Sequence, residues 1–281
     1  MISVGLAALA AFAWGASDFC GGKAAQREDA LAAAVVSQIL GLPVILLCVL
    51  LIPGHLQFRD FAFATVAGIA EFAAIVLLYR GLASGAMTIV APTAAASTAV
   101  SAMVIGLAAD PIPGELALGG AGCVVLAIPL VCRTQVGGPA CRPGIVLALP
   151  ITLAVVAGVM FGAYFTLLGQ AAEGSGAWPI LALKSATISL GLFASGVRRT
   201  SLRMPKQAMT WVAVAGVGDA AANVLYLLAA RDGPLCIIAP VAAVAPMGTV
   251  ILAMAIDRER IRPLQIAGLG LSATAIVLIA I

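Results

Sequence analysis

The sequence contains one 30-residue stretch twice, 148 positions apart. Residues 66–95 read VAGIAEFAAIVLLYRGLASGAMTIVAPTAA and residues 214–243 read VAGVGDAAANVLYLLAARDGPLCIIAPVAA, with 13 of the 30 positions identical and no gap. Further matches at offsets of 147 and 148 join Gly15 to Gly162 and Gly120 to Gly268. Because the matches extend to both ends of each half, we expect two related units, residues 1–134 and 143–281.

Each unit contains five apolar segments of the length that a lipid bilayer requires. The chain is 63% hydrophobic and only 10% charged, whereas soluble domains carry about 25% charged residues. A spanning helix needs about 20 mainly apolar residues, and helices satisfy their own backbone polar groups in lipid. The sequence therefore predicts an all-α integral membrane protein. The predicted spans are 3–22, 30–52, 61–82, 86–109, 114–132, 144–170, 176–197, 207–230, 234–256 and 263–281.

The odd number of spans in each unit predicts that the two halves are inverted. A second copy of a five-helix unit enters the membrane from the opposite side, so a pseudo-two-fold axis lies in the membrane plane. This arrangement is typical of secondary transporters, whose substrate cavity lies between the halves near the midplane. Pro92 and Pro240 occupy matched positions inside spans. We interpret them as a shared hinge, with a static bend as the alternative.

The residues needed for other functions are missing from the sequence. It has no G-x-x-x-x-G-K phosphate-binding loop, and its only histidine, His55, lies in a polar loop. No His, Cys and carboxylate cluster has the spacing of a metal site. The net charge of +3 is small and dispersed. We therefore expect no enzyme activity, cofactor, metal or nucleic-acid partner, and expect membrane lipid and a small-molecule substrate instead.

Ionisable residues inside the spans are the main functional signal, since such groups normally face a cavity or a partner. Glu71 and Asp219 match across the repeat, Lys184 lies in the seventh predicted span and Asp18 near the end of the first. Lys184 could meet a substrate carboxylate, and an acid could meet an amino group or carry a proton. The alternative is a buried ion pair of Lys184 with Glu71 or Asp219. One lysine cannot neutralise both acids.

Polar and aromatic residues on the same helical faces extend this candidate site. Asn223 and Tyr226 follow Asp219 at i+4 and i+7, and Tyr79 follows Glu71 at i+8. Aromatic rings on the first and sixth spans either line a cavity or pack against neighbours. The predicted substrate-binding set is Trp14, Asp18, Glu71, Tyr79, Tyr164, Lys184, Asp219, Asn223 and Tyr226.

Three stretches of the sequence are distinctive: AFAWGASDF in the first span, the turn before APTAAAS in the fourth, and the ending AIDRERIRPLQIAGLGLSATAIVL. In these stretches the chain resembles the EamA-type exporters of the drug/metabolite transporter superfamily. The resemblance covers essentially the whole chain, and its size and ten-span plan are similar to those of aromatic amino acid exporters. It implies ten helices around a central cavity, in the inner membrane, with both termini in the cytoplasm. The loop charges instead predict both termini outside, so both orientations remain open.

The leading hypothesis is a secondary transporter that exports small metabolites by alternating access, with apolar or aromatic amino acids as substrates. The second hypothesis is a proton-coupled exporter of lipophilic cations, in which Glu71 or Asp219 binds both proton and drug. The third is a membrane scaffold without transport. The sequence leaves open the coupling ion, the direction of transport and the oligomeric state.

Overall fold

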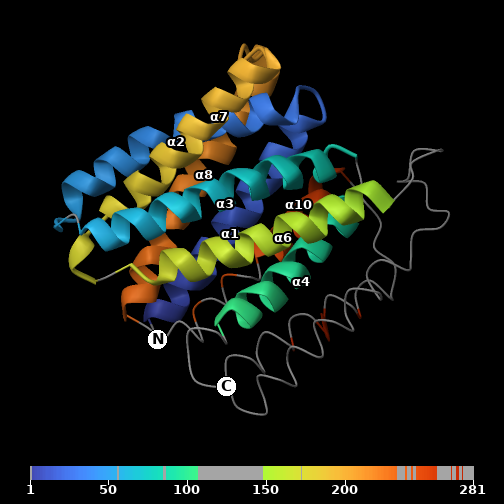
Figure 1. Ribbon diagram of the computed structural model, residues 1–281. Coiled ribbons are helices and arrows are strands. Elements are labelled where there is room, and N and C mark those ends of the chain that lie inside the picture. The colour runs from blue at the N-terminus through green and yellow to red at the C-terminus, as the bar shows by residue number, and fades with distance from the viewer. Residues whose placement is uncertain are drawn as a thin grey trace.

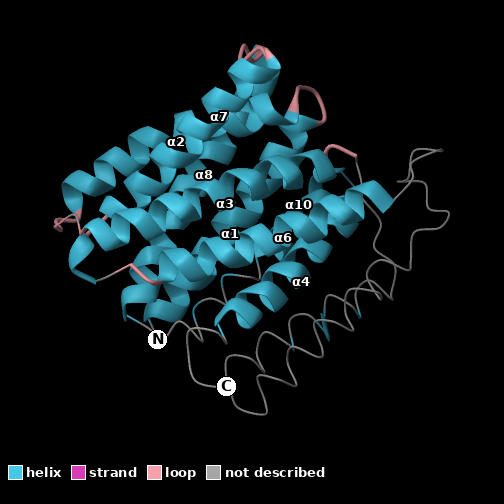
Figure 2. Cartoon of the chain, in the orientation of Figure 1, coloured by secondary structure: helices cyan, strands magenta, loops and turns pink. Residues whose placement is uncertain are grey.

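A computed structural model describes residues 2–55, 57–84, 87–106, 148–171, 173–232, 238, 242, 245–257, 267, 270, 271 and 274. Within these ranges the chain forms helices and loops, without a strand (Figure 2). The described elements, labelled in Figure 1, are α1 (Ile2–Ala25), α2 (Ala30–Leu51), α3 (Phe58–Leu82), α4 (Met87–Gly106), α6 (Ala148–Gly169), η2 (Glu173–Ser175), α7 (Trp178–Arg198), α8 (Lys206–Asp232) and α10 (Ala245–Asp257).

Six of the described helices are long and apolar enough to cross a membrane, namely α1, α2, α3, α6, α7 and α8. A shorter apolar stretch, Ile89–Ala102, lies in α4. The predicted spans 30–52 and 207–230 correspond closely to α2 and α8. The predicted span 114–132 and most of 263–281 lie outside the described residues, so the count of ten remains a prediction.

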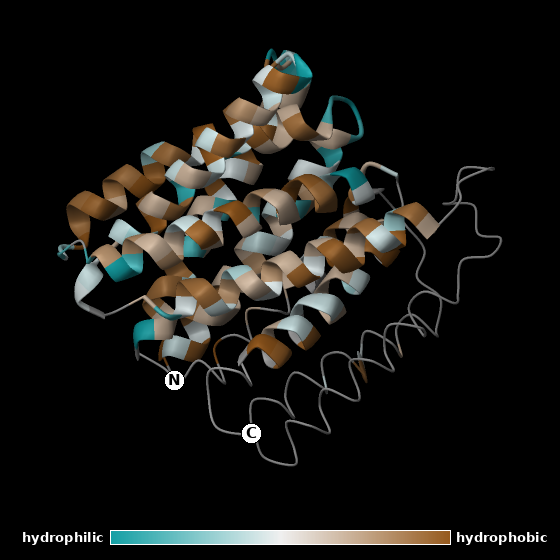
Figure 3. Ribbon diagram, in the orientation of Figure 1, coloured by the Kyte–Doolittle hydropathy of each residue, from teal (hydrophilic) through white to brown (hydrophobic). Residues whose placement is uncertain are grey.

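Large apolar side chains cover the outside of the helix bundle. Leu50 on α2 is 81% exposed, Phe58 on α3 is 86% exposed and Phe193 on α7 is 69% exposed. Figure 3 shows hydrophobic residues along the outer helices and hydrophilic ones gathered mainly at loops and helix ends. Lipid tails accept such a surface without the free-energy cost that water would impose. The chain is therefore a multi-pass membrane protein.

The ends of the helices follow from local hydrogen bonding. The Asp29 carboxylate accepts hydrogen bonds from the backbone N–H groups of Leu31 and Ala32 and caps the start of α2. At the end of α7, Arg199 has a left-handed backbone with φ of 53°, and its N–H group bonds back to the Ser195 and Gly196 carbonyls. Polar residues therefore mark the start of one apolar helix, α2, and the end of another, α7.

The helices of one half pack mainly against helices of the other half. Helix α1 packs against α8 and α10, and α2 packs against α8 and α7. Helix α3 packs against α6 and α7, and α4 packs against α6 and α10. The sequence repeat relates α1 to α6, α2 to α7, α3 to α8 and α4 to α10. Exchanging each helix for its counterpart turns the α1–α8 pair into the α6–α3 pair, and likewise turns α2–α8 into α7–α3.

Matched glycines form two of the close contacts between these helices. Gly216 of α8 lies against α2, where an added Cβ would stand 1.9 Å from the Ser37 carbonyl oxygen. Its repeat counterpart, Gly68 of α3, lies against α7, where an added Cβ would stand 2.3 Å from the Leu183 oxygen. Small residues allow helix backbones to approach this closely in lipid. The two contacts hold α2 and α7 against the two helices that carry the matched acids.

Candidate functional site

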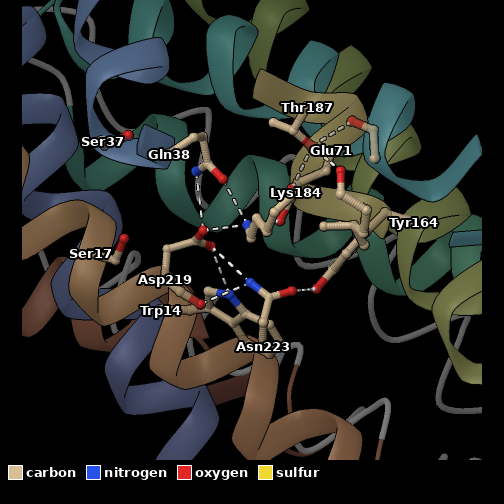
Figure 4. A network of polar contacts seen from close by, with 12 residues as sticks. Trp14, Ser17, Ser37, Gln38, Glu71, Tyr164, Lys184, Thr187, Asp219 and Asn223 are labelled. Atoms are coloured by element: carbon tan, nitrogen blue, oxygen red, sulfur yellow. Dashed lines mark hydrogen bonds and ion pairs between the residues drawn. The ribbon is translucent and has the colours of Figure 1, made fainter. Parts of the chain in front are cut away.

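The Lys184 ammonium group lies at the centre of the described bundle and connects four helices. Its Nζ donates hydrogen bonds to Asp219 Oδ2 at 2.6 Å, Glu71 Oε1 at 2.7 Å and Gln38 Oε1 at 2.7 Å. Lys184 is 2% exposed, Glu71 1% and Asp219 7%. Figure 4 shows these side chains converging from α2, α3, α7 and α8. The two acids matched in the sequence thus share a single lysine.

The geometry around Lys184 accounts for how a charge is held in this interior. An ammonium has three N–H donors, and here three acceptors take them. Burying a charge is costly unless ion pairing and hydrogen bonds offset its lost hydration. Since every donor is engaged, Lys184 has none free for a substrate carboxylate in this conformation.

The Asp219 carboxylate accepts more hydrogen bonds than Glu71. Its Oδ2 accepts from Gln38 Nε2 at 3.1 Å in addition to Lys184. Its Oδ1 accepts from Trp14 Nε1 at 3.2 Å and from Asn223 Nδ2 at 3.2 Å. Asn223, one turn later on α8, also donates to the Asp219 backbone carbonyl at 2.8 Å. Asp219 therefore joins α1 and α2 to its own helix.

Within the described residues, the Glu71 carboxylate accepts hydrogen bonds from α7 only. Besides Lys184, its partner is Thr187, whose Oγ1 lies 2.9 Å from Glu71 Oε2. The same hydroxyl lies 2.9 Å from the Gly68 carbonyl and 3.0 Å from the Leu183 carbonyl. A threonine hydroxyl has one proton to donate, so these acceptors share it. Glu71 is thus the less firmly satisfied of the two matched acids.

A pocket opens beside this network and contains about 680 Å³ of space, including its part open to the outside. Acidic and aromatic side chains are prominent in its lining. The acids are Asp18, Glu71 and Asp219. The aromatic residues are Trp14, Tyr79, Phe161, Tyr164 and Phe165. Small and aliphatic residues of α3, α4 and α10 complete the wall.

Aromatic rings from three helices pack together at this pocket. The ring of Phe165 lies 5.2 Å from that of Trp14, 4.8 Å from that of Tyr164 and 5.2 Å from that of Tyr226, measured between centroids. These separations are typical of favourable aromatic pairs. The cluster fixes α1, α6 and α8 relative to one another, so the pocket has a firm apolar side.

The structure divides the predicted binding residues into two groups. The six that line the pocket are Trp14, Asp18, Glu71, Tyr79, Tyr164 and Asp219. Lys184 and Asn223 lie behind them in the polar network, and Tyr226 packs against the rings of Trp14 and Phe165. Their roles in binding a substrate remain predictions. Pro92 lies inside α4, and Pro240 lies outside the described residues.

Several residues of this site were not among the predicted ones, and four of them contribute polar contacts or an aromatic ring. Gln38 and Thr187 bond to the matched acids, and Ser17 and Phe165 line the pocket. Gln38 and Thr187 are polar residues in apolar spans, a signal that could have identified them. Within the described part of the chain, no group of three or more His, Cys, Asp or Glu residues could hold a metal ion.

Two buried tyrosines of the aromatic cluster allow a matched test of the polar network. The Tyr164 hydroxyl donates to Asn223 Oδ1 at 2.7 Å, whereas the buried Tyr226 hydroxyl has no hydrogen-bond partner among the residues that the structure describes. We expect Tyr164→Phe to lower stability by about 2 kcal/mol, because the buried Asn223 carbonyl loses its donor. We expect Tyr226→Phe to cost nothing. Melting temperatures in detergent compare the two, and equal losses would contradict the assignment.

The fold and the buried polar centre together define a helical membrane protein with an internal pocket. Residues 148–281 match the EamA-like transporter family. This match indicates a membrane transporter of small molecules.

The structural comparison covers almost the whole chain. A solved structure described as "Crystal structure of protein" is 12% identical, has a TM-score of 0.69, and the alignment covers 98% of this chain and 96% of that one. At this identity the likeness concerns the fold alone. The comparison with curated proteins gave no match.

Proposed function

We propose that this chain is a secondary transporter, not an enzyme, that exports small amino-bearing molecules across the inner membrane. Alternating access between two inverted halves would move the substrate. The reciprocal helix pairs, α1–α8 with α6–α3 and α2–α8 with α7–α3, support this mechanism. Two halves built alike can exchange conformations, which exposes the pocket to each side in turn.

The charge of the pocket is the main observation in support of this substrate class. Three carboxylates line it, and no described lining residue is a lysine or arginine. A positively charged amino group suits such a wall. The aromatic rings of α1 and α6 suit an apolar or aromatic body, and cations bind favourably over such rings. Amino acids with apolar or aromatic side chains are the first candidate substrates.

A second candidate, an organic cation without a carboxylate, is supported by the geometry of Lys184. This lysine would repel a cation if its charge faced the pocket, and would bind a substrate carboxylate if it had a free donor. Instead its three donors are engaged by Gln38, Glu71 and Asp219. Lipophilic cations, exchanged for protons, therefore belong to the same proposal.

Flux into proteoliposomes tests both candidates. Radiolabelled phenylalanine carries an ammonium and a carboxylate, and phenethyltrimethylammonium carries a permanent positive charge that prevents leakage through lipid. We expect flux of at least one above that of protein-free liposomes, with little competition from unlabelled 3-phenylpropionate, which lacks the amino group. Equal competition by 3-phenylpropionate would contradict the substrate class. Flux of no compound would favour the scaffold hypothesis.

A further inference from the structure

One of the three pocket carboxylates, that of Asp18, has no partner among the described residues. Glu71 accepts hydrogen bonds from Lys184 and Thr187, and Asp219 accepts them from Lys184 and three further side chains. Asp18 makes no hydrogen bond or ion pair with any residue in the described part of the chain. It is partly buried and lines the pocket. A carboxyl group in this position is stabilised either by a proton or by a cation that binds beside it.

The surroundings of Asp18 strengthen this requirement. Asp219 lies near enough to interact with it electrostatically, and both carry negative charge when ionised. The cation of the network, Lys184, is already bonded to Glu71 and Asp219. Lys184 thus contacts only two of the three acids, and a positively charged occupant of the pocket would reduce the repulsion among them when they are ionised.

The repeat pairs Asp18 of α1 with an aromatic residue of α6. Three positions of α1 and their counterparts at offset 147 in α6 all line the pocket. The pairs are Trp14 with Phe161, Ser17 with Tyr164, and Asp18 with Phe165. One half thus contributes an acid where the other contributes a phenyl ring. The wall of the pocket therefore combines charged and apolar groups at equivalent positions of the two halves.

We infer that Asp18 is the carboxylate that receives the ammonium group of the substrate, while the α6 rings hold its apolar body. This inference rests on the proposed function and assigns its specificity to one residue. Lys184 is then a positioning residue that keeps Glu71 and Asp219 in place without touching the substrate. The ligand class is an organic ammonium with an aromatic or aliphatic body, whether or not it also bears a carboxylate.

Binding of two isosteric probes to the detergent-purified full chain tests the assignment. Phenethylamine carries the ammonium, and 2-phenylethanol replaces it with a neutral hydroxyl. We expect calorimetry to give about tenfold or more tighter binding of the amine. Asp18→Asn and Asp18→Ser should abolish that preference while leaving the affinity for the alcohol unchanged. Asp18→Glu should keep it, and the control Glu28→Gln, changed in the loop before α2, should match the original protein.

The outcomes separate this inference from the proposed function. A preference for the amine that survives both neutral variants would overturn the assignment to Asp18 and leave the proposed function intact. Failure of the unchanged protein to bind either probe would contradict the amino-bearing substrate class itself. Removing an unpaired carboxylate beside Asp219 relieves repulsion, so the neutral variants should melt no lower than the original protein, and the melting temperature checks this.

Discussion

Lys184→Met is expected to lower the stability of the protein by about 3–5 kcal/mol, the range seen when one partner of a buried ion pair is removed. The substitution would leave the Glu71 and Asp219 carboxylates buried and without the cation that both contact. The Gln38 carbonyl would also lose its donor. Methionine has a similar length and no charge, so the loss would reflect electrostatics more than packing.

Melting temperatures in detergent measure this effect, and a rescue variant shows its cause. Adding Glu71→Gln and Asp219→Asn to Lys184→Met removes both uncompensated charges, and the Gln38 amide can turn its oxygen towards the new Asn amide group. We expect the triple variant to regain most of the lost stability. Lys206→Met, at the exposed start of α8, is the matched control. A Lys184→Met protein as stable as the control would contradict the importance of the shared lysine.

Gly216→Ala has the second-largest expected effect. The new methyl group would lie 1.9 Å from the Ser37 carbonyl oxygen and 2.8 Å from its carbonyl carbon, so the α2 and α8 backbones must separate. Overpacked sites cost about 1–3 kcal/mol, and we expect the upper end because backbone atoms cannot rotate away. Separation would also pull Gln38, the residue after Ser37, from Asp219, which lies one turn beyond Gly216.

A glycine without neighbours serves as the control for this prediction. A Cβ added to Gly196, near the end of α7, meets nothing within 4 Å. Since alanine favours a helix by about 1 kcal/mol over glycine, Gly196→Ala should leave the melting temperature unchanged or raise it. Gly68→Ala, at the counterpart contact, should behave like Gly216→Ala. Equal melting temperatures for Gly216→Ala and Gly196→Ala would show that the helices tolerate separation.

The helices were predictable to the extent that their ends are marked in the sequence. The predicted span 176–197 ends one residue before α7 does, because the apolar run stops at Arg198 and Arg199. The predicted span 3–22 ends three residues before α1 does, because the polar Lys23 lies inside the last turn of the helix. Hydropathy follows the lipid boundary, whereas a helix continues until its backbone hydrogen bonds end.

The candidate site was predictable as a set of residues but not as an arrangement. Periodicity placed Asn223 on the same face as Asp219, and the two are hydrogen bonded. The sequence left open whether Lys184 pairs with Glu71 or Asp219, and the structure pairs it with both. Which polar groups line the pocket depends on the rotation of each helix about its axis. Neighbouring helices that are far apart in the sequence set that rotation, so the residue pattern of one segment cannot predict it.

The sequence by itself determined a membrane-embedded helical chain with two related halves and a polar centre. In lipid, few structures satisfy the hydrogen bonds of the backbone. Ionisable side chains carry a high free-energy cost there, so they normally have a functional or structural role. Only the tertiary structure decided that Lys184 is fully engaged and that Asp18 faces the pocket with no partner in the described part of the chain. Both outcomes depend on how helices of the two halves pack together: Lys184 contacts Gln38 and Glu71 across the halves, and glycines such as Gly216 set how closely such helices approach.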